Sequence, residues 1–210
     1  MNVFQFILQN HTEVLEHMRE HLWMVVASTF LAVIIGIPLG ILISRKPGWD
    51  KPILGGANII QTVPSLALFG FLLPLPWIGA RSERLAILAL TLYALLPLIR
   101  NTYAGINGVD RAVVEAGRGM GMTDRQLLWQ VQLPLALGVI IAGVRVAAVI
   151  SVGLATIAAA IGAGGLGEYI FRGLAMVNNQ LILVGAIPAA ALALLADFTL
   201  GWLERRLSPA

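Results

Sequence analysis

The sequence predicts an all-α, polytopic membrane protein, because it combines few charges with long apolar runs. Of its 210 residues, 58% are hydrophobic and only 12% are charged, whereas a soluble globular domain carries roughly 25% charged residues. Several stretches reach the roughly 20 apolar residues that a helix needs to cross a bilayer. This composition excludes a free soluble enzyme and a broad basic surface for nucleic acid. The absence of cysteine excludes disulfides and thiol chemistry.

We expect about five transmembrane helices, within residues 22–43, 52–80, 85–103, 134–161 and 173–203. The second stretch is longer than one span and is interrupted by Pro64, Pro74 and Pro76. Residues 2–20 are expected to form an amphipathic helix at the membrane interface, because their apolar side chains recur at helical spacing. The predicted organisation is an N-terminal amphipathic segment, residues 1–21, followed by a transmembrane domain, residues 22–206.

The basic residues predict the orientation of the chain. With the N-terminus outside, nine of them fall on the cytoplasmic side, namely Arg45, Lys46, Lys51, Arg100, Arg111, Arg118, Arg125, Arg205 and Arg206. Four fall outside, namely Arg19, Arg81, Arg84 and Arg172. Because cytoplasmic loops carry an excess of lysine and arginine, we expect the N-terminus outside and the C-terminus in the cytoplasm.

Residues 105–133 form the one long polar stretch that this orientation places in the cytoplasm. Asp110 is a candidate N-cap for a short helix, and three glycines, Gly117, Gly119 and Gly121, are expected to break it. Thr123 and Gln126 have the spacing of a capping box, which predicts a second short helix over 124–133. A plain connection between helices takes about 2–8 residues, so this length favours a docking surface. A DNA-binding helix-turn-helix fits poorly, because acidic residues offset the loop's arginines and both ends are tied to the bilayer.

The same loop resembles the EAA motif of ABC importer permeases. The motif reads Glu115-Ala116-Gly117, three residues, Gly121, nine residues, and then Val131-Gln132-Leu133-Pro134. Gly117 replaces the second alanine of the family pattern and Val131 replaces its isoleucine, while the spacing is intact. The resemblance implies a type I ABC importer permease fold with a cytoplasmic coupling helix. It also implies that an ATPase subunit docks at Glu115, Ala116, Gly117, Gly121, Leu133 and Pro134.

Further segments are similar to permeases for glycine betaine, carnitine and choline, at residues 61–67, 119–123, 161–167, 171–174 and 185–189. This resemblance implies a subunit of the bacterial inner membrane that works with a second permease subunit, identical or not, and with an external substrate-binding protein. A methionine importer permease has a similar plan and is the nearest alternative. The sequence contains no G-x-x-x-x-G-K-[ST] loop, so we expect no bound cofactor and place ATP and Mg²⁺ on the partner ATPase.

Polar residues inside the predicted spans are the remaining candidates. Asn58, Gln61, Thr62 and Ser65 follow helical spacing next to Pro64, which indicates either contacts between helices or a translocation path. Arg145 and Asp197 are the ionisable residues well inside spans. Each costs at least ~2.5 kcal/mol alone, so we expect them to pair. Gly36 and Gly40 fit a GxxxG packing motif.

Two further classes of protein compete with an ABC permease. An ion-coupled secondary transporter usually shows internal repeats or several intramembrane ionisable groups, and neither feature is found in this sequence. A membrane-bound enzyme needs a cluster of histidines or carboxylates at one face. His11, His17 and His21 lie near the N-terminus without an evident carboxylate cluster, so we expect interfacial polar residues and no metal site.

Overall fold

The computed structural model describes residues 3–46, 48–76 and 81–208, and every regular element within them is helical. The helices are α1 (Val3–Gln9), α2 (His11–Arg45), α3 (Asp50–Thr62), α4 (Ser65–Leu72), α5 (Ser82–Asn107), α6 (Arg111–Gly119), α7 (Asp124–Gln126), α8 (Leu133–Ala158), α9 (Gly167–Ala175) and α10 (Asn179–Leu207). A π-helical segment, Leu127–Gln132, joins α7 to α8, and a 3₁₀ turn, Ala159–Ile161, follows α8.

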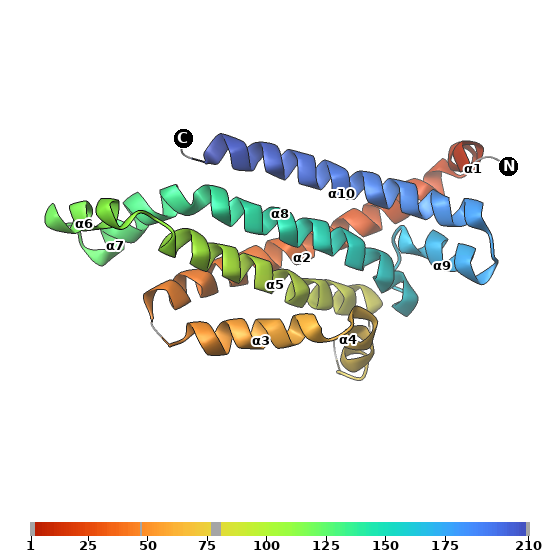
Figure 1. Cartoon of the computed structure of the whole chain (residues 1–210). Helices are drawn as coiled ribbons and strands as arrows, with labels where there is room; N and C mark the ends of the chain where they lie inside the picture. The colour runs from red at the N-terminus through yellow and green to blue at the C-terminus, as the bar shows by residue number, and fades with distance from the viewer. Residues whose placement is uncertain (1–2, 47, 77–80, 209–210) are drawn as a thin grey trace.

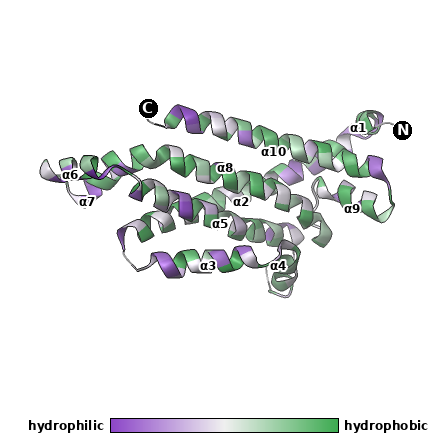
Figure 2. Cartoon of the chain, in the orientation of Figure 1, coloured by the Kyte–Doolittle hydropathy of each residue, from purple (hydrophilic) through white to green (hydrophobic). Residues whose placement is uncertain are grey.

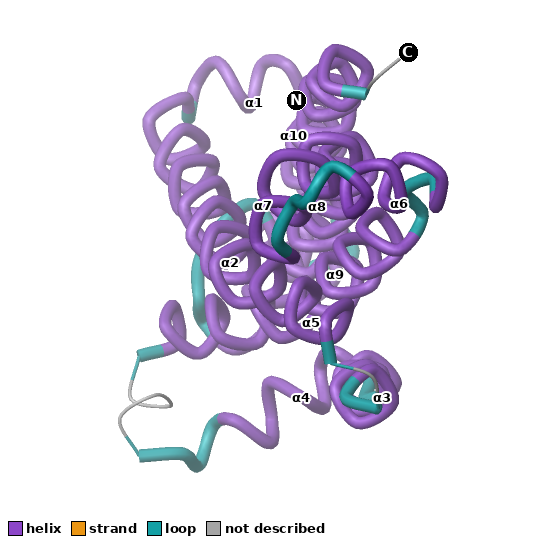
Figure 3. The backbone as a smooth tube through the Cα atoms, turned by 90° about the vertical axis from the view of Figure 1, so that its left-hand side faces the viewer, coloured by secondary structure: helices purple, strands orange, loops and turns teal. Residues whose placement is uncertain are grey.

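Long helices form an elongated bundle in which α5 packs against both α2 and α8, and α10 packs along α8 (Figure 1). Viewed from the end, α3 and α4 lie to one side of α5, away from α10 (Figure 3). The N-terminus lies at one end of the bundle, and the C-terminus lies towards the other end, which also carries α6 and α7 (Figure 1). Hydrophobic residues cover the long helices, as Figure 2 shows. The described residues contain four helices that could each span a bilayer, and five spans if α3 and α4 count as one.

The first span is longer than the sequence analysis predicted. Helix α2 runs for 35 residues without a break from His11, so only α1 forms a separate N-terminal helix. The expected surface helix over residues 2–20 is therefore divided, and residues 1–2 lie outside the described part. At 1.5 Å per residue, α2 is roughly 50 Å long, which exceeds the ~30 Å hydrocarbon core. The first turns of α2 carry the charged residues Glu13, Glu16, Arg19 and Glu20, so its apolar part begins near Leu22.

Two glycines allow α2 to lie directly against α5. A Cβ atom at Gly36 would sit 2.8 Å from Cβ of Leu98, and one at Gly40 would sit 2.5 Å from Cβ of Thr102. Both distances are shorter than carbon atoms tolerate, so these positions accept glycine because the helices approach so closely. The pair performs the close packing that its spacing predicted.

The second predicted span is broken rather than continuous. Helix α3 ends at Thr62, α4 begins at Ser65, and the two axes are bent by 100°. Pro64 explains the position of the break, because a proline pushes the preceding residue out of the helical region. Val63 accordingly has φ −69° and ψ 128°. Residues 77–80, the end of the predicted span, lie outside the described residues.

The fourth span begins earlier than expected, because the helix predicted over 124–133 does not stop at residue 133 but continues into the span. Backbone helix continues from Asp124 to Ile161, a length of 38 residues. Pro134 cannot donate a hydrogen bond to the carbonyl four residues before it. The π-helical segment ends at Gln132, two residues before Pro134, and accommodates the missing donor, with Leu133 N–H donating to the Leu128 carbonyl five residues earlier.

The fifth span, α10, begins at Asn179, inside the stretch 173–203 that was predicted to contain it, and continues to Leu207. The Asn178 side chain accepts hydrogen bonds from the backbone N–H groups of Gln180 and Leu181, which fixes the start of α10. Before it lie α9 and the glycine-rich turn, residues 162–167. Gly162, Gly164 and Gly165 in this turn have φ between +73° and +82°, a region that favours glycine. The turn therefore separates α8 from α9.

Candidate functional site

Helix α6 projects from one end of the bundle and is fixed at both ends by local hydrogen bonds. At its start, Asp110 accepts a hydrogen bond from Ala112 N–H at 2.9 Å, as the sequence predicted. At its end, Gly121 N–H donates to the Arg118 carbonyl and Met122 N–H donates to the Gly117 carbonyl. This pattern is a Schellman motif, which requires a left-handed residue at the position of Gly121. Gly121 has φ +83°.

Of the three glycines expected to break this helix, only Gly121 lies outside it. Gly117 and Gly119 are both helical, so the prediction for these two was wrong. Gly117 is buried, and a Cβ atom there would lie 3.2 Å from the Met122 sulfur and 3.6 Å from Leu127 Cγ. The glycine in place of the family's alanine therefore lets α6 pack tightly on the helix that follows the turn.

The turn between α6 and α7 ends in the capping box that the sequence predicted. Gln126 N–H donates to Thr123 Oγ1 at 3.3 Å, and Thr123 N–H donates to Gln126 Oε1 at 2.8 Å. Leu127 is buried, and α6 packs on the π-helical segment that contains it. Helix α6 is thus held against a helix that continues without a break into the fourth span.

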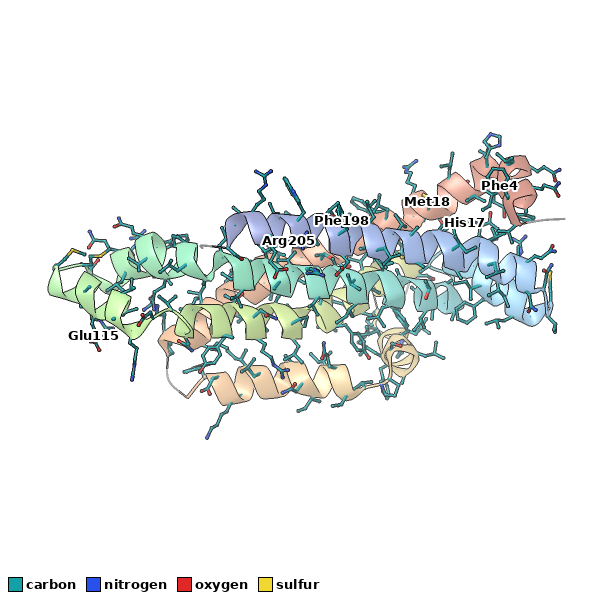
Figure 4. The ribbon with its side chains drawn as sticks, turned by 45° about the horizontal axis from the view of Figure 1, so that its top comes forward. Phe4, His17, Met18, Glu115, Phe198 and Arg205 are labelled. Atoms are coloured by element: carbon teal, nitrogen blue, oxygen red, sulfur yellow. The ribbon has the colours of Figure 1, made fainter. Side chains whose placement is uncertain are left out.

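The coupling residues taken from the resemblance divide into exposed and internal groups. Glu115 and Ala116 are exposed on α6, and Figure 4 shows Glu115 at the end of the bundle opposite His17. Exposed apolar side chains lie near them, at Val113, Met120 and Trp129, with Met120 77% exposed. Leu133 is half-buried and Pro134 is exposed where α8 begins. This end of the bundle therefore presents exposed acidic side chains, at Asp110, Glu115 and Asp124, together with exposed apolar ones.

A contact that sequence analysis missed ties this region to the first span. Arg45, in the last turn of α2, donates a hydrogen bond to the side-chain oxygen of Gln132. Gln132 is buried in the π-helical segment directly before Leu133. The two residues are 87 positions apart, so no local pattern could have indicated the pair.

The four polar residues predicted on one face of the second span are separated by its break. Ser65 begins α4, so it does not continue the face of Asn58, Gln61 and Thr62 on α3. Asn58 accepts a hydrogen bond from Arg100 at 3.0 Å, and Thr62 donates to the carbonyl of Ile59 in its own helix. Asn58 and Thr62 are exposed in this chain.

Gln61 has a structural partner instead. Pro97 in α5 cannot donate to the Tyr93 carbonyl, and Gln61 Nε2 donates to that carbonyl at 3.0 Å. The Tyr93 hydroxyl in turn donates to the Val63 carbonyl at the break between α3 and α4. These two bonds satisfy backbone groups that lipid cannot satisfy, and they hold α3 to α5.

Arg145 and Asp197 are brought together between α8 and α10, and a third charge joins them. Arg145 Nε and Nη2 donate to the two Asp197 oxygens at 2.6 and 2.8 Å, which is a bidentate pair. Arg145 Nη1 donates to Glu204 Oε2 at 3.2 Å. Gly201 lies between the two acids on α10, where a Cβ atom would be 3.0 Å from Arg145 Nη1. Sequence analysis missed Glu204, although it follows Asp197 by seven residues on one helical face.

The N-terminal histidines differ from the expectation of interfacial polar residues. His21 is fully buried, and His17 lies within 4 Å of three carboxylates, those of Glu13, Glu20 and Glu168. Glu168 comes from α9, 151 positions further along the chain, so the cluster was not visible in the sequence. The described residues contain no group of three or more acidic, histidine or cysteine side chains with the geometry of a metal site.

Comparison with known proteins gives consistent results for sequence and fold. The profile of the family described as "Binding-protein-dependent transport system inner membrane component" matches residues 32–209. The chain is 44% identical over 207 residues to the carnitine transport permease protein OpuCB of Listeria monocytogenes, covering 99% of this chain and 94% of that protein. It is 48% identical over 202 residues to the glycine betaine/carnitine/choline transport system permease protein OpuCD of Bacillus subtilis, covering 96% and 87%.

Among solved structures, the fold matches a chain of the MetNI methionine ABC transporter in an inward-facing conformation. The TM-score is 0.86 at 23% identity, and the match covers 95% of this chain and 98% of that chain. An amino acid ABC transporter matches with a TM-score of 0.79 at 17% identity, covering 97% and 98%. At these identities the likeness concerns the fold alone.

The charge cluster between α8 and α10 leads to a ranked prediction. Asp197→Asn should lower the amount and the thermal stability of folded protein in nanodiscs more than Glu204→Gln, because Asp197 accepts two of the three hydrogen bonds from Arg145. Combining Arg145→Gln with Asp197→Asn should cost less than the sum of the two single changes, since neither charge is left alone. Equal effects of the two acid variants, or additive losses in the double variant, would contradict this account.

Proposed function

The chain belongs to the family of binding-protein-dependent transport system inner membrane components, and we propose that it carries small compatible solutes of the glycine betaine, carnitine and choline class. It is a permease subunit of an ABC importer, with an all-helical, multi-pass fold. The observation that supports the solute class is that relatives 44% and 48% identical over nearly the whole chain are named as carnitine and glycine betaine/carnitine/choline permeases. The methionine alternative is supported only by likeness of fold.

The solutes named share a quaternary ammonium group, which places one constraint on the path through the membrane. Asp197 is bound by Arg145, so its carboxylate is not free to hold a cation. A path without a free carboxylate suits weak, transient contact during passage. Asn58 and Thr62 on α3 and Ser65 on α4 are the polar residues that we propose to line it, while the Gln61 amide holds α3 to α5.

ATP binding and hydrolysis belong to a separate ATPase subunit in this proposal, because the sequence has no phosphate-binding loop. The ATPase docks on the exposed surface of α6, where Glu115 faces a basic residue of the partner and the apolar side chains of Val113, Met120 and Trp129 become buried. Movement of α6 then reaches the bilayer directly, because α6 packs on the helix that continues to Ile161.

Membership of the same family supports two further partners. A second permease subunit, identical or different, completes the path, and an external binding protein delivers the solute. The chain then has its N-terminus outside and α6 in the cytoplasm. The opposite ends of the bundle occupied by α6 and by the N-terminus support this arrangement, together with the excess of basic residues near α6.

This orientation is tested by labelling single cysteines in the cysteine-free chain. Thr12 and Arg125 are both exposed and lie at the two ends of the bundle. In intact cells, a membrane-impermeant maleimide should label Thr12→Cys, whereas Arg125→Cys should react only after the membrane is permeabilised. The reverse pattern would overturn the orientation.

The coupling role is tested at Gly121, whose φ of +83° closes the turn after α6. Gly121→Val should leave insertion near normal but reduce ATP-driven solute uptake by about tenfold or more, because a side chain in left-handed backbone costs roughly 1–2 kcal/mol and displaces the turn. Co-purification of the ATPase subunit should fall with it.

Gly119→Val is the matched control for this experiment. A Cβ atom at either glycine would meet nothing within 4 Å, but Gly119 has helical backbone. The control should therefore retain the ATPase subunit and uptake. If Gly121→Val also retains both, α6 is not the coupling element. If Gly121→Val and Gly119→Val lose the ATPase subunit and solute uptake to the same extent, the backbone conformation of Gly121 is not the cause of the loss.

A further inference from the structure

His17 lies near the outer end of α2 with both of its ring nitrogens directed at carboxylates. Its Nδ1 is 3.1 Å from Glu20 Oε2, and its Nε2 is 3.7 Å from Glu168 Oε2 and 3.9 Å from Glu13 Oε1. The side chain is only 14% exposed. Glu13 and Glu20 belong to α2, whereas Glu168 lies in the first turn of α9.

This arrangement suits one protonation state of the ring. A neutral imidazole carries one N–H donor and one lone pair, whereas an ionised carboxylate only accepts hydrogen bonds. With a neutral ring, one nitrogen would direct its lone pair at carboxylate oxygen. The imidazolium form donates a hydrogen bond from Nδ1 to Glu20, and its positive charge attracts Glu13 and Glu168, whose oxygens lie 3.9 and 3.7 Å from Nε2.

The surrounding charges favour the same form. Arg172 on α9 is the cation that contacts these acids among the described residues, with Nη1 3.4 Å from Glu13 Oε1. Tyr169 packs edge-on against His17 with ring centroids 5.1 Å apart, and burial raises the pKa of Tyr169 to about 12, so it stays neutral. From α1 and α10 the neighbours of Tyr169 are apolar, at Phe6, Leu181 and Val184. Three carboxylates therefore face one permanent cation, and a charged His17 reduces the remaining excess of negative charge.

One of the acids that contact His17, Glu20, also holds the glycine-rich turn before α9. Glu20 Oε2 accepts a hydrogen bond from Gly165 N–H at 2.8 Å as well as contacting His17. A Cβ atom at Gly164 would lie 2.5 Å from the same Glu20 oxygen, so the turn is wrapped closely around this carboxylate. The buried His21, one turn further along α2, packs against Gly165. His17 thus lies at the junction of α2, the turn and α9.

We propose that protonated His17 holds α9 and the glycine-rich turn against α2 by pairing with acids of both helices. We further propose that this contact weakens when His17 loses its proton. The sign follows from the contacts, because a histidine that gains acidic partners in the closed junction stabilises it at lower pH and loses this contribution as pH rises. This device lies at the end of the bundle opposite α6 and is independent of which solute is carried (Figure 4).

The experiment measures the distance between α2 and α9 directly. Spin labels are placed on cysteines at Leu15 and Leu174, which are both exposed, in the otherwise cysteine-free full chain in nanodiscs. In the parent chain, the distance distribution should be narrow at pH 5.5 and broader or longer at pH 8. His17→Gln should show the broad distribution at both pH values, because glutamine carries no charge at either.

His11→Gln is the matched control, since His11 is exposed and its ring contacts only the Leu8 carbonyl. It should keep the full pH response of the parent chain. A pH response that persists in His17→Gln, or its absence from the parent chain, would overturn the proposal. Because the purified chain is measured without ATPase or solute, these outcomes do not depend on the proposed transport function.

Discussion

The interior of a bilayer offers the backbone no hydrogen-bond partners, and the architecture of this chain follows from that constraint. Its long segments are helices, and the structure compensates for two of the prolines within them. Pro97 leaves the Tyr93 carbonyl unpaired within α5, and Gln61 supplies the missing donor. Pro134 is accommodated by a π-helical segment rather than by a break. The charge of the half-buried Arg145 is paired with two acids on one face of α10.

Continuity of one helix connects the exposed end of the molecule with its membrane region. Helix α6 is capped by Asp110 at its start and by the Gly121 turn at its end, so its position relative to α7 is fixed by local bonds. From Asp124 the backbone remains helical through the fourth span, and Arg45 ties the π-helical segment to the first span. A force applied to α6 therefore has a short, rigid route to two transmembrane helices, which is the mechanical requirement for coupling to a separate ATPase.

Features determined by neighbouring residues could be predicted from the sequence, and features determined by distant contacts could not. The Asp110 cap, the capping box of Thr123 and Gln126 and the conformation of Gly121 depend on a few adjacent positions, and all are present. The pairing of Arg145 with Asp197 followed from the cost of isolated charge in lipid. Pro64 marked the position of the break after Thr62, whereas the role of Glu204 and the carboxylates around His17 depend on tertiary packing, which periodicity does not report.

We infer one transport role, in which this chain forms the path of an importer driven by ATP hydrolysis on a partner subunit. It is tested most directly in proteoliposomes that contain this permease with its ATPase and its binding protein, by measuring the uptake of radiolabelled glycine betaine, carnitine and choline. The account predicts that uptake of at least one of these solutes requires both ATP and the binding protein, and that the loaded binding protein stimulates ATP hydrolysis. Uptake that follows an ion gradient in the absence of ATP would contradict it.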